Sequence, residues 1–221
     1  QVWDSVRATE AGAQMAIRAR WSTVIFYRLR PAILMLIVVR VVLIGALLWD
    51  LTAFSGDYLN YLTGGITPEL PLAAAVVLLA LLMAASMLLP LTAIGFNAAV
   101  GMLVSTYIHQ RIYSVLAQIT LIAIRLALVV FLLVNVTDFR TGGILAVEGS
   151  DLALWLIVFV FAAVGDWGLV LLHLEFFGQA VWPEIPNSIL IAPALFVYVV
   201  VQTVLIDLLL TLAARRAERS E

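Results

Sequence analysis

The chain has 221 residues, of which 64% are apolar and only 12% are charged. A soluble globular domain carries roughly a quarter charged residues, so this composition excludes that class and indicates an integral membrane protein. The net charge of -2 comes without a basic stripe, so no feature predicts binding to nucleic-acid phosphates. The lack of cysteine excludes disulfides, thiolate catalysis and cysteine-bound metals.

The first 30 residues predict a basic, partly amphipathic helical lead-in on the cytoplasmic side of a membrane. Five arginines stand there against two carboxylates, next to the first apolar segment, where arginine marks the cytoplasmic face. The lead-in acts either as a flank that fixes topology or as an interfacial helix that docks a cytoplasmic partner. Residues 31–213 form the predicted membrane domain, and the arginines of the tail, 214–221, place that end in the cytoplasm too. Because the sequence begins at Gln1, without a signal peptide, it is also compatible with a fragment of a longer protein.

Five apolar segments predict an all-α, polytopic membrane helical bundle. The first, Pro31–Trp49, has the length that a bilayer requires. The second, 71–108, holds no charged residue and as a single helix would overshoot a hydrocarbon core of about 30 Å. The remaining segments are Ser114–Val134, Leu152–Phe177 and Ser188–Ala213.

Five crossings cannot place both arginine-rich ends on one side, so one segment must be interpreted differently. One solution folds 71–108 into a hairpin at Pro90, which gives six crossings and moves Arg111 outside. The other keeps that run as one long, kinked crossing and makes Leu152–Val181 a re-entrant hairpin that turns at Gly165–Gly168. Re-entrant backbone is tolerated when it is buried in protein or lines a cavity. We favour the second solution because it leaves every arginine cluster inside.

Four ionisable residues lie within the apolar segments, namely Arg40, Arg125, Asp166 and Asp207. Each would cost about 2.5 to 3.5 kcal/mol at the centre of a bilayer, so positions facing lipid are disfavoured. The simplest interpretation is a buried ion pair between Asp166 and either Arg40 or Arg125. A pathway for an ion, a proton or a polar substrate, and a contact with another subunit, stay open as alternatives.

Small residues in the second apolar run predict close helix packing. Ala80 and Ala84 stand four residues apart, as do Gly95 and Ala99, with Gly101 close by. Such spacing places small side chains on one helix face and lets two backbones approach each other.

His173 is the candidate for a cofactor ligand in a membrane helix, with Asp166 seven residues earlier on the same face. A bis-histidine haem needs a second histidine at a matching depth, whereas His109 lies at a predicted membrane interface. Glu175 beside His173 is too little for a metal site, which needs three or four suitable ligands. The sequence therefore predicts no cofactor, no metal and no catalytic residue.

Two parts of the chain resemble bacterial ABC-2-type exporter permeases. The segments Trp3–Thr9, Arg18–Trp21 and Tyr27–Pro31, which lead into a membrane helix, resemble the cytoplasmic lead-in of that family. Gly95–Thr106, a small-residue helix that ends at a short basic step, resembles it too. The resemblance implies a multi-pass permease of the bacterial inner membrane, with re-entrant helices before its last crossing.

The same resemblance implies partners. Such a permease dimerises and works with a separate cytoplasmic ATPase, on which any ATP hydrolysis would occur, to move a hydrophobic or amphipathic substrate. The polar step between the second and third apolar runs would then be a candidate ATPase contact, through His109, Gln110, Arg111 and Tyr113.

Two other classes of function stay open. The chain could be a non-catalytic structural subunit of a larger respiratory or photosynthetic membrane complex, with its arginines and small residues used for packing. It could also be a secondary transporter that uses Asp166 and Asp207.

Overall fold

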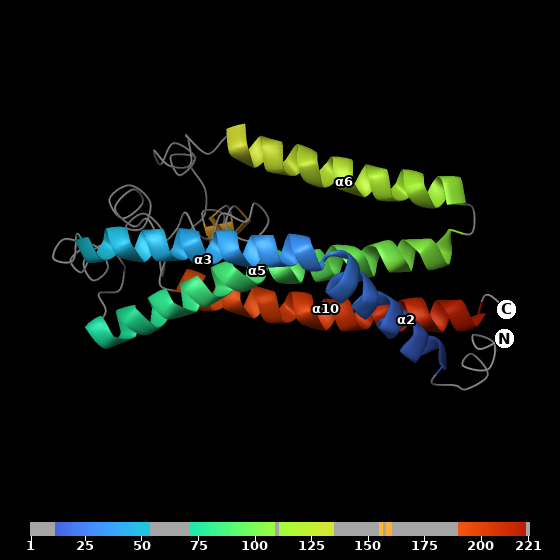
Figure 1. The fold of residues 1–221 in the computed structure, drawn as a ribbon, viewed down its shortest axis with the longest axis horizontal. Helices are drawn as coiled ribbons and strands as arrows, with labels where there is room; N and C mark the ends of the chain where they lie inside the picture. Colours follow the sequence, from blue (N-terminus) through green and yellow to red (C-terminus); the bar gives the residue numbers. More distant parts are fainter. Residues whose placement is uncertain are drawn as a thin grey trace. The chain divides into compact units, whose positions relative to one another are not determined.

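The chain folds as an all-α membrane bundle, which confirms the predicted class. A computed structural model describes residues 12–53, 71–108, 111–134, 155–156, 158–160 and 190–219. These residues are almost entirely helical, and no strand occurs among them (Figure 1). Four of the described helices are long and apolar enough to cross a membrane.

The helices begin and end close to the predicted apolar segments. In chain order they are α2 (Gly12–Thr23), the π-helix η1 (Val24–Arg28), α3 (Arg30–Ala53), α5 (Leu72–Tyr107), α6 (Arg111–Val134) and α10 (Ile191–Arg219). The predicted first crossing corresponds to α3, the third apolar segment to α6 and the last to α10.

The long second run forms one continuous helix, so the alternative that folds it into a hairpin at Pro90 is wrong. α5 has 36 residues, and Pro90 lies inside it. Proline removes one backbone hydrogen bond, but membrane helices tolerate it because neighbouring groups satisfy the freed carbonyl. The favoured alternative also requires a re-entrant hairpin over Leu152–Val181. Apart from 155–156 and 158–160, that hairpin lies outside the described residues.

Between α2 and α3 the chain passes through the π-helix η1. Pro31 has no N–H, and its ring would clash with the carbonyl four residues earlier, so an α-helix cannot run unchanged through this point. The backbone N–H of Leu29 instead donates to the carbonyl of Val24, 3.0 Å away, which closes the wider turn. As a result α2 leaves the line of α3 and crosses α10 (Figure 1).

The chain divides into two compact units. Unit 1 comprises Gln1–Ile37, Leu91–Arg125 and Val200–Glu221, and unit 2 comprises Val38–Pro90 and Leu126–Val199. Among the described residues, unit 1 holds nine of the ten arginines. Unit 1 is therefore strongly basic within the described part of the chain.

Three half-buried aromatic rings pack together in unit 2. The ring of Phe159 stacks on that of Trp155 at 5.7 Å and meets the ring of Tyr198 edge-on at 5.5 Å. The buried Ser86 donates its hydroxyl to the carbonyl of Leu82 in its own helix, at 2.8 Å. Its hydroxyl is thus satisfied without a polar neighbour from another helix.

Candidate functional site

In unit 1, α2 meets α5 and α10 at a place that we call the α2 junction. It is defined by Arg18 and Trp21 of α2, Gly95 and Ala99 of α5, and Ile206, Asp207 and Leu210 of α10. These residues come from three helices that are far apart in sequence.

Trp21 joins α2 to α5 at a glycine. Its indole Nε1–H donates to the backbone carbonyl of Gly95, with 3.1 Å between nitrogen and oxygen. A Cβ atom at position 95 would lie 3.1 Å from Cδ1 of Ile206 and 3.4 Å from Cζ2 of Trp21. Gly95 is buried, and its missing side chain makes room for both neighbours at once.

An apolar cluster surrounds this contact. Ala99, Ile206 and Leu210 form its buried centre. The residues packed around them are Ile17, Trp21, Phe96, Met102 and Leu209. Because Ala99 is one helical turn from Gly95, the two small residues present one face of α5 to the same neighbours.

Arg18 and Asp207 form an ion pair at the exposed side of the junction. Nη2 of Arg18 lies 2.6 Å from Oδ1 of Asp207, and the two side chains are 46% and 63% exposed. A charge-assisted hydrogen bond of this length is short, but exposure to solvent limits its contribution to stability. Asp207 was predicted among the intramembrane charges, whereas its partner on α2 was not predicted.

A second polar contact joins α5 and α10 deeper in the unit. The hydroxyl of Thr92 donates to Oε1 of Gln202 at 2.6 Å, and the Gln202 side chain is buried. Polar side chains often bridge helices in this way inside membranes.

The basic end of α10 lies against the end of α5. The guanidinium of Arg216 sits over the ring of Tyr107, 5.3 Å from its centroid, as in a cation–π interaction. The predicted ATPase contact follows directly in sequence. Of that step, Tyr113 has an exposed side chain, Arg111 begins α6, and His109 and Gln110 lie outside the described residues.

The other predicted charges have different surroundings. Arg40 is buried within unit 2, whereas the side chain of Arg125 is exposed on α6. Asp166, the predicted partner of one of them, lies outside the described residues, as does His173.

The remaining predicted packing residues lie on α5 away from the junction. Ala80 is exposed and Ala84 is half-buried. A Cβ atom at Gly101 would meet nothing within 4 Å. Of the five predicted packing residues, Gly95 and Ala99 are thus the two that are buried.

No metal-binding cluster occurs in the described ranges, where no three histidine or carboxylate side chains gather. No protein-family model, curated protein or solved structure matches the chain.

The α2 junction was only partly visible in the sequence. The Gly95–Ala99 spacing predicted a packing face, but nothing in it indicates which helix packs there. Arg18 and Trp21 are three residues apart and so share one face of α2. That pattern was the one available signal that α2 presents a polar and an aromatic group in the same direction.

Proposed function

We propose that this chain is the membrane-spanning permease subunit of an ABC-type exporter, working with a separate cytoplasmic ATPase. In this proposal the protein lies in the bacterial inner membrane with both termini in the cytoplasm. A second permease copy completes the transporter, and the substrate is hydrophobic or amphipathic.

One observation carries this proposal. The two sequence stretches that resemble ABC-2-type permeases are in contact through the hydrogen bond from Trp21 to Gly95. In this chain the lead-in helix is thus held against the small-residue helix.

The charge distribution supports the orientation. Arginine accumulates on the cytoplasmic side of membrane proteins, and unit 1 holds nine of the ten described arginines. α2 belongs to that unit and precedes the first candidate span, so it would lie on the side that a cytoplasmic ATPase could reach.

The junction also suits a subunit whose conformation is changed by a separate ATPase. α2 is attached to α5 through Trp21 and to α10 through Arg18. A displacement of α2 would therefore act on two membrane helices at once, because packed side chains transmit strain.

The first test is gentle purification from the native membrane, with mass spectrometry of the chains that accompany the protein and an absorption spectrum of the same sample. We expect a stoichiometric nucleotide-binding chain, ATP hydrolysis by the complex and a colourless sample. Haem or chlorophyll bands together with redox subunits would overturn the proposal.

A matched pair of variants locates the ATPase contact. Tyr113 and Tyr27 are both exposed, at 58% and 79%, but only Tyr113 belongs to the predicted contact step. We expect Tyr113→Ala to reduce recovery of the ATPase and Tyr27→Ala to retain it. The reverse result would move the contact to η1.

One observation favours the second candidate function, a structural subunit of a larger membrane complex. None of the described side chains within the α6 span is buried, and Arg125 is exposed on that helix. An arginine inside a span is costly against lipid, which favours a protein neighbour at this face. Co-purification separates the two candidates, because the neighbour is a permease copy in one and a different subunit in the other.

A further inference from the structure

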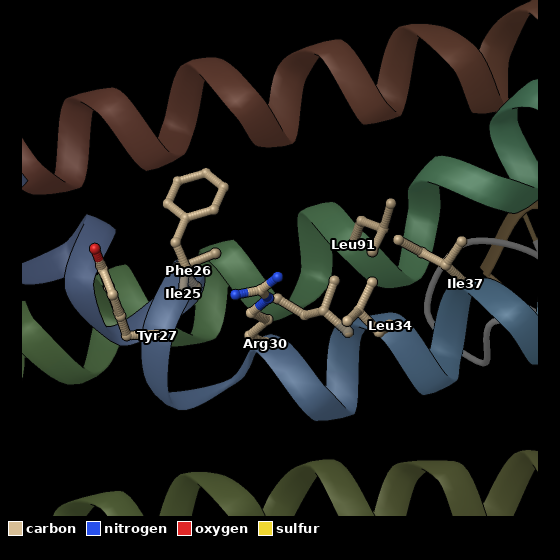
Figure 2. A pocket seen from close by; sticks show the side chains of 8 residues that line it. Ile25, Phe26, Tyr27, Arg30, Leu34, Ile37 and Leu91 are labelled. Atoms are coloured by element: carbon tan, nitrogen blue, oxygen red, sulfur yellow. The ribbon is translucent and has the colours of Figure 1, made fainter.

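A groove of about 620 Å³ lies in unit 1 where η1 meets the first turns of α3 (Figure 2). Its walls are apolar or aromatic side chains from η1 and α3, together with Leu91 of α5. Among the described residues that line it, Arg30 carries the only charge. The volume falls in the range of about 300 to 1,000 Å³ that is typical of small-molecule sites.

The groove lies at the beginning of the first candidate span. Arg30 is the first residue of the candidate span Arg30–Trp49, and an arginine at the end of a span is typical of the level of the lipid headgroups. Leu34 and Ile37 line the groove one and two helical turns further along α3. At 1.5 Å per residue, the distance from Arg30 to Ile37 is about 10 Å along the helix axis, within one leaflet of about 15 Å.

Apolar side chains line the groove on both sides of Arg30. In Figure 2, Arg30 stands between Ile25 and Phe26 of η1 on one side and Leu34 and Ile37 of α3 on the other. Phe26 and Leu34 are 65% and 51% exposed, so both leave apolar surface uncovered within the described structure. Along α3, the Arg30 cation is thus followed by the apolar surface of Leu34 and Ile37.

We propose that this groove binds an anionic phospholipid, with the phosphate on the Arg30 guanidinium and one acyl chain along Leu34 and Ile37. Guanidinium groups match phosphate oxygens in a two-point hydrogen-bonded geometry. The described lining residues include no carboxylate that could bind the cation of a zwitterionic headgroup. The groove should therefore prefer a lipid with a net negative charge. Tyr27, which also lines the groove, is 79% exposed, and aromatic rings of its kind are enriched at membrane interfaces.

The site depends on η1. The π-helix and the bend at Leu29 separate α2 from the line of α3, and side chains of η1 and α3 line the groove. Single π turns of this kind are frequent at functional sites. The lipid site does not depend on the proposed exporter function, because every residue it uses belongs to this chain.

Photo-crosslinking with lipid probes tests the proposal. The purified full chain is placed in phosphatidylcholine nanodiscs that contain either phosphatidylglycerol or phosphatidylcholine with a photoactivatable acyl chain. Mass spectrometry then locates and quantifies the labelled peptides. We expect stronger labelling of the segment around Leu34 and Ile37 by the phosphatidylglycerol probe.

Three variants separate the headgroup contact from general attraction to a basic surface. Arg30→Gln should lower phosphatidylglycerol labelling about fivefold, the ratio that one basic residue adds to binding of anionic lipid. Arg215→Gln removes an exposed arginine of the same unit outside the groove and should leave labelling unchanged. Leu34→Trp fills the groove and should lower labelling by both probes.

The outcomes that overturn the proposal are distinct. Equal labelling by the two probes in the unmodified protein, or an equal loss in Arg215→Gln, would show that Arg30 does not select the headgroup. Unchanged labelling in Leu34→Trp would show that no acyl chain occupies the groove. If Arg30→Gln does not elute as folded protein, two measurements still test the proposal. The probe comparison in the unmodified protein tests headgroup selection, and Leu34→Trp tests whether an acyl chain occupies the groove. No ATPase is present in these samples, so neither result depends on the exporter proposal.

Discussion

α10 and α6 are both apolar helices of membrane-spanning length, yet their side chains are buried very differently. α10 buries a seam of residues at helical spacing, namely Val199, Gln202, Ile206, Leu210 and Ala213. None of the described side chains within the α6 span is buried. Apolar composition therefore identifies the bilayer as the solvent of a helix, but it does not determine which helices pack together.

The polar residues of the two helices show the same contrast. On α10, Gln202 is bonded to Thr92 and Asp207 to Arg18. On α6, Gln118 and Arg125 are exposed within a span. Helix packing in membranes depends on small residues and on polar partners, because lipid tails are as apolar as leucine. Within unit 1, α10 packs against small residues of α5 and also has polar partners. The substitutions below test how much the small residues and the polar partners contribute to stability.

The largest effect is expected from Gly95→Leu. A Cβ atom there already lies 3.1 Å from Ile206, so a larger side chain must displace Ile206 and Trp21. Overpacking of this kind costs about 1 to 3 kcal/mol of unfolding free energy, which denaturant unfolding in detergent would measure. Gly101→Leu, in the same helix with nothing within 4 Å, should change stability by less than about 0.5 kcal/mol. Equal losses in the two variants would contradict the close contact at Gly95.

A smaller effect is expected from the polar contact between α5 and α10. A double-mutant cycle with Thr92→Val and Gln202→Leu should give a coupling free energy of about 0.6 kcal/mol, and at most about 1.7 kcal/mol. Thr120→Val on α6 is the comparison, because that hydroxyl donates only to Leu116 of its own helix, at 2.9 Å. A coupling free energy of zero would mean that the contact adds nothing to the packing of α10.

The smallest effect is expected from Arg18→Gln. The ion pair with Asp207 is exposed, so its loss should lower the unfolding free energy by only about 0.2 to 1 kcal/mol. The difference should disappear in about 1 M salt, where the screening length is about 3 Å. Arg20→Gln, an exposed arginine of the same helix, should show no such salt-dependent difference. A loss that persists in high salt would mean that Arg18 acts through packing of its aliphatic stem.

The sequence predicted correctly those features that depend on one continuous segment of the chain, such as a membrane-spanning helix. The apolar run of α3 and the charge-free run of α5 are each long enough to identify the bilayer as their environment. The continuity of α5 through Pro90 was harder to predict, because a proline is compatible with both a kinked helix and a turn.

The α2 junction could not be predicted for a different reason. Arg18 and Asp207 are 189 residues apart, and no pattern near either one identifies the other. Which face of a helix meets a neighbour depends on how each helix is rotated about its axis, and that rotation is set by contacts between distant segments. Gly95 and Ala99 indicated a packing face in the sequence. That Trp21 packs against this face is seen only in the three-dimensional structure.

The open space at Gly95 also has a consequence for how this sequence can vary. Position 95 contributes to the junction by the absence of a side chain, and Trp21 uses both that space and the backbone carbonyl beside it. Two residues that share one volume are not free to change independently. Chains descended from a common ancestor with this one should therefore gain bulk at position 95 only where positions 21 and 206 have lost it.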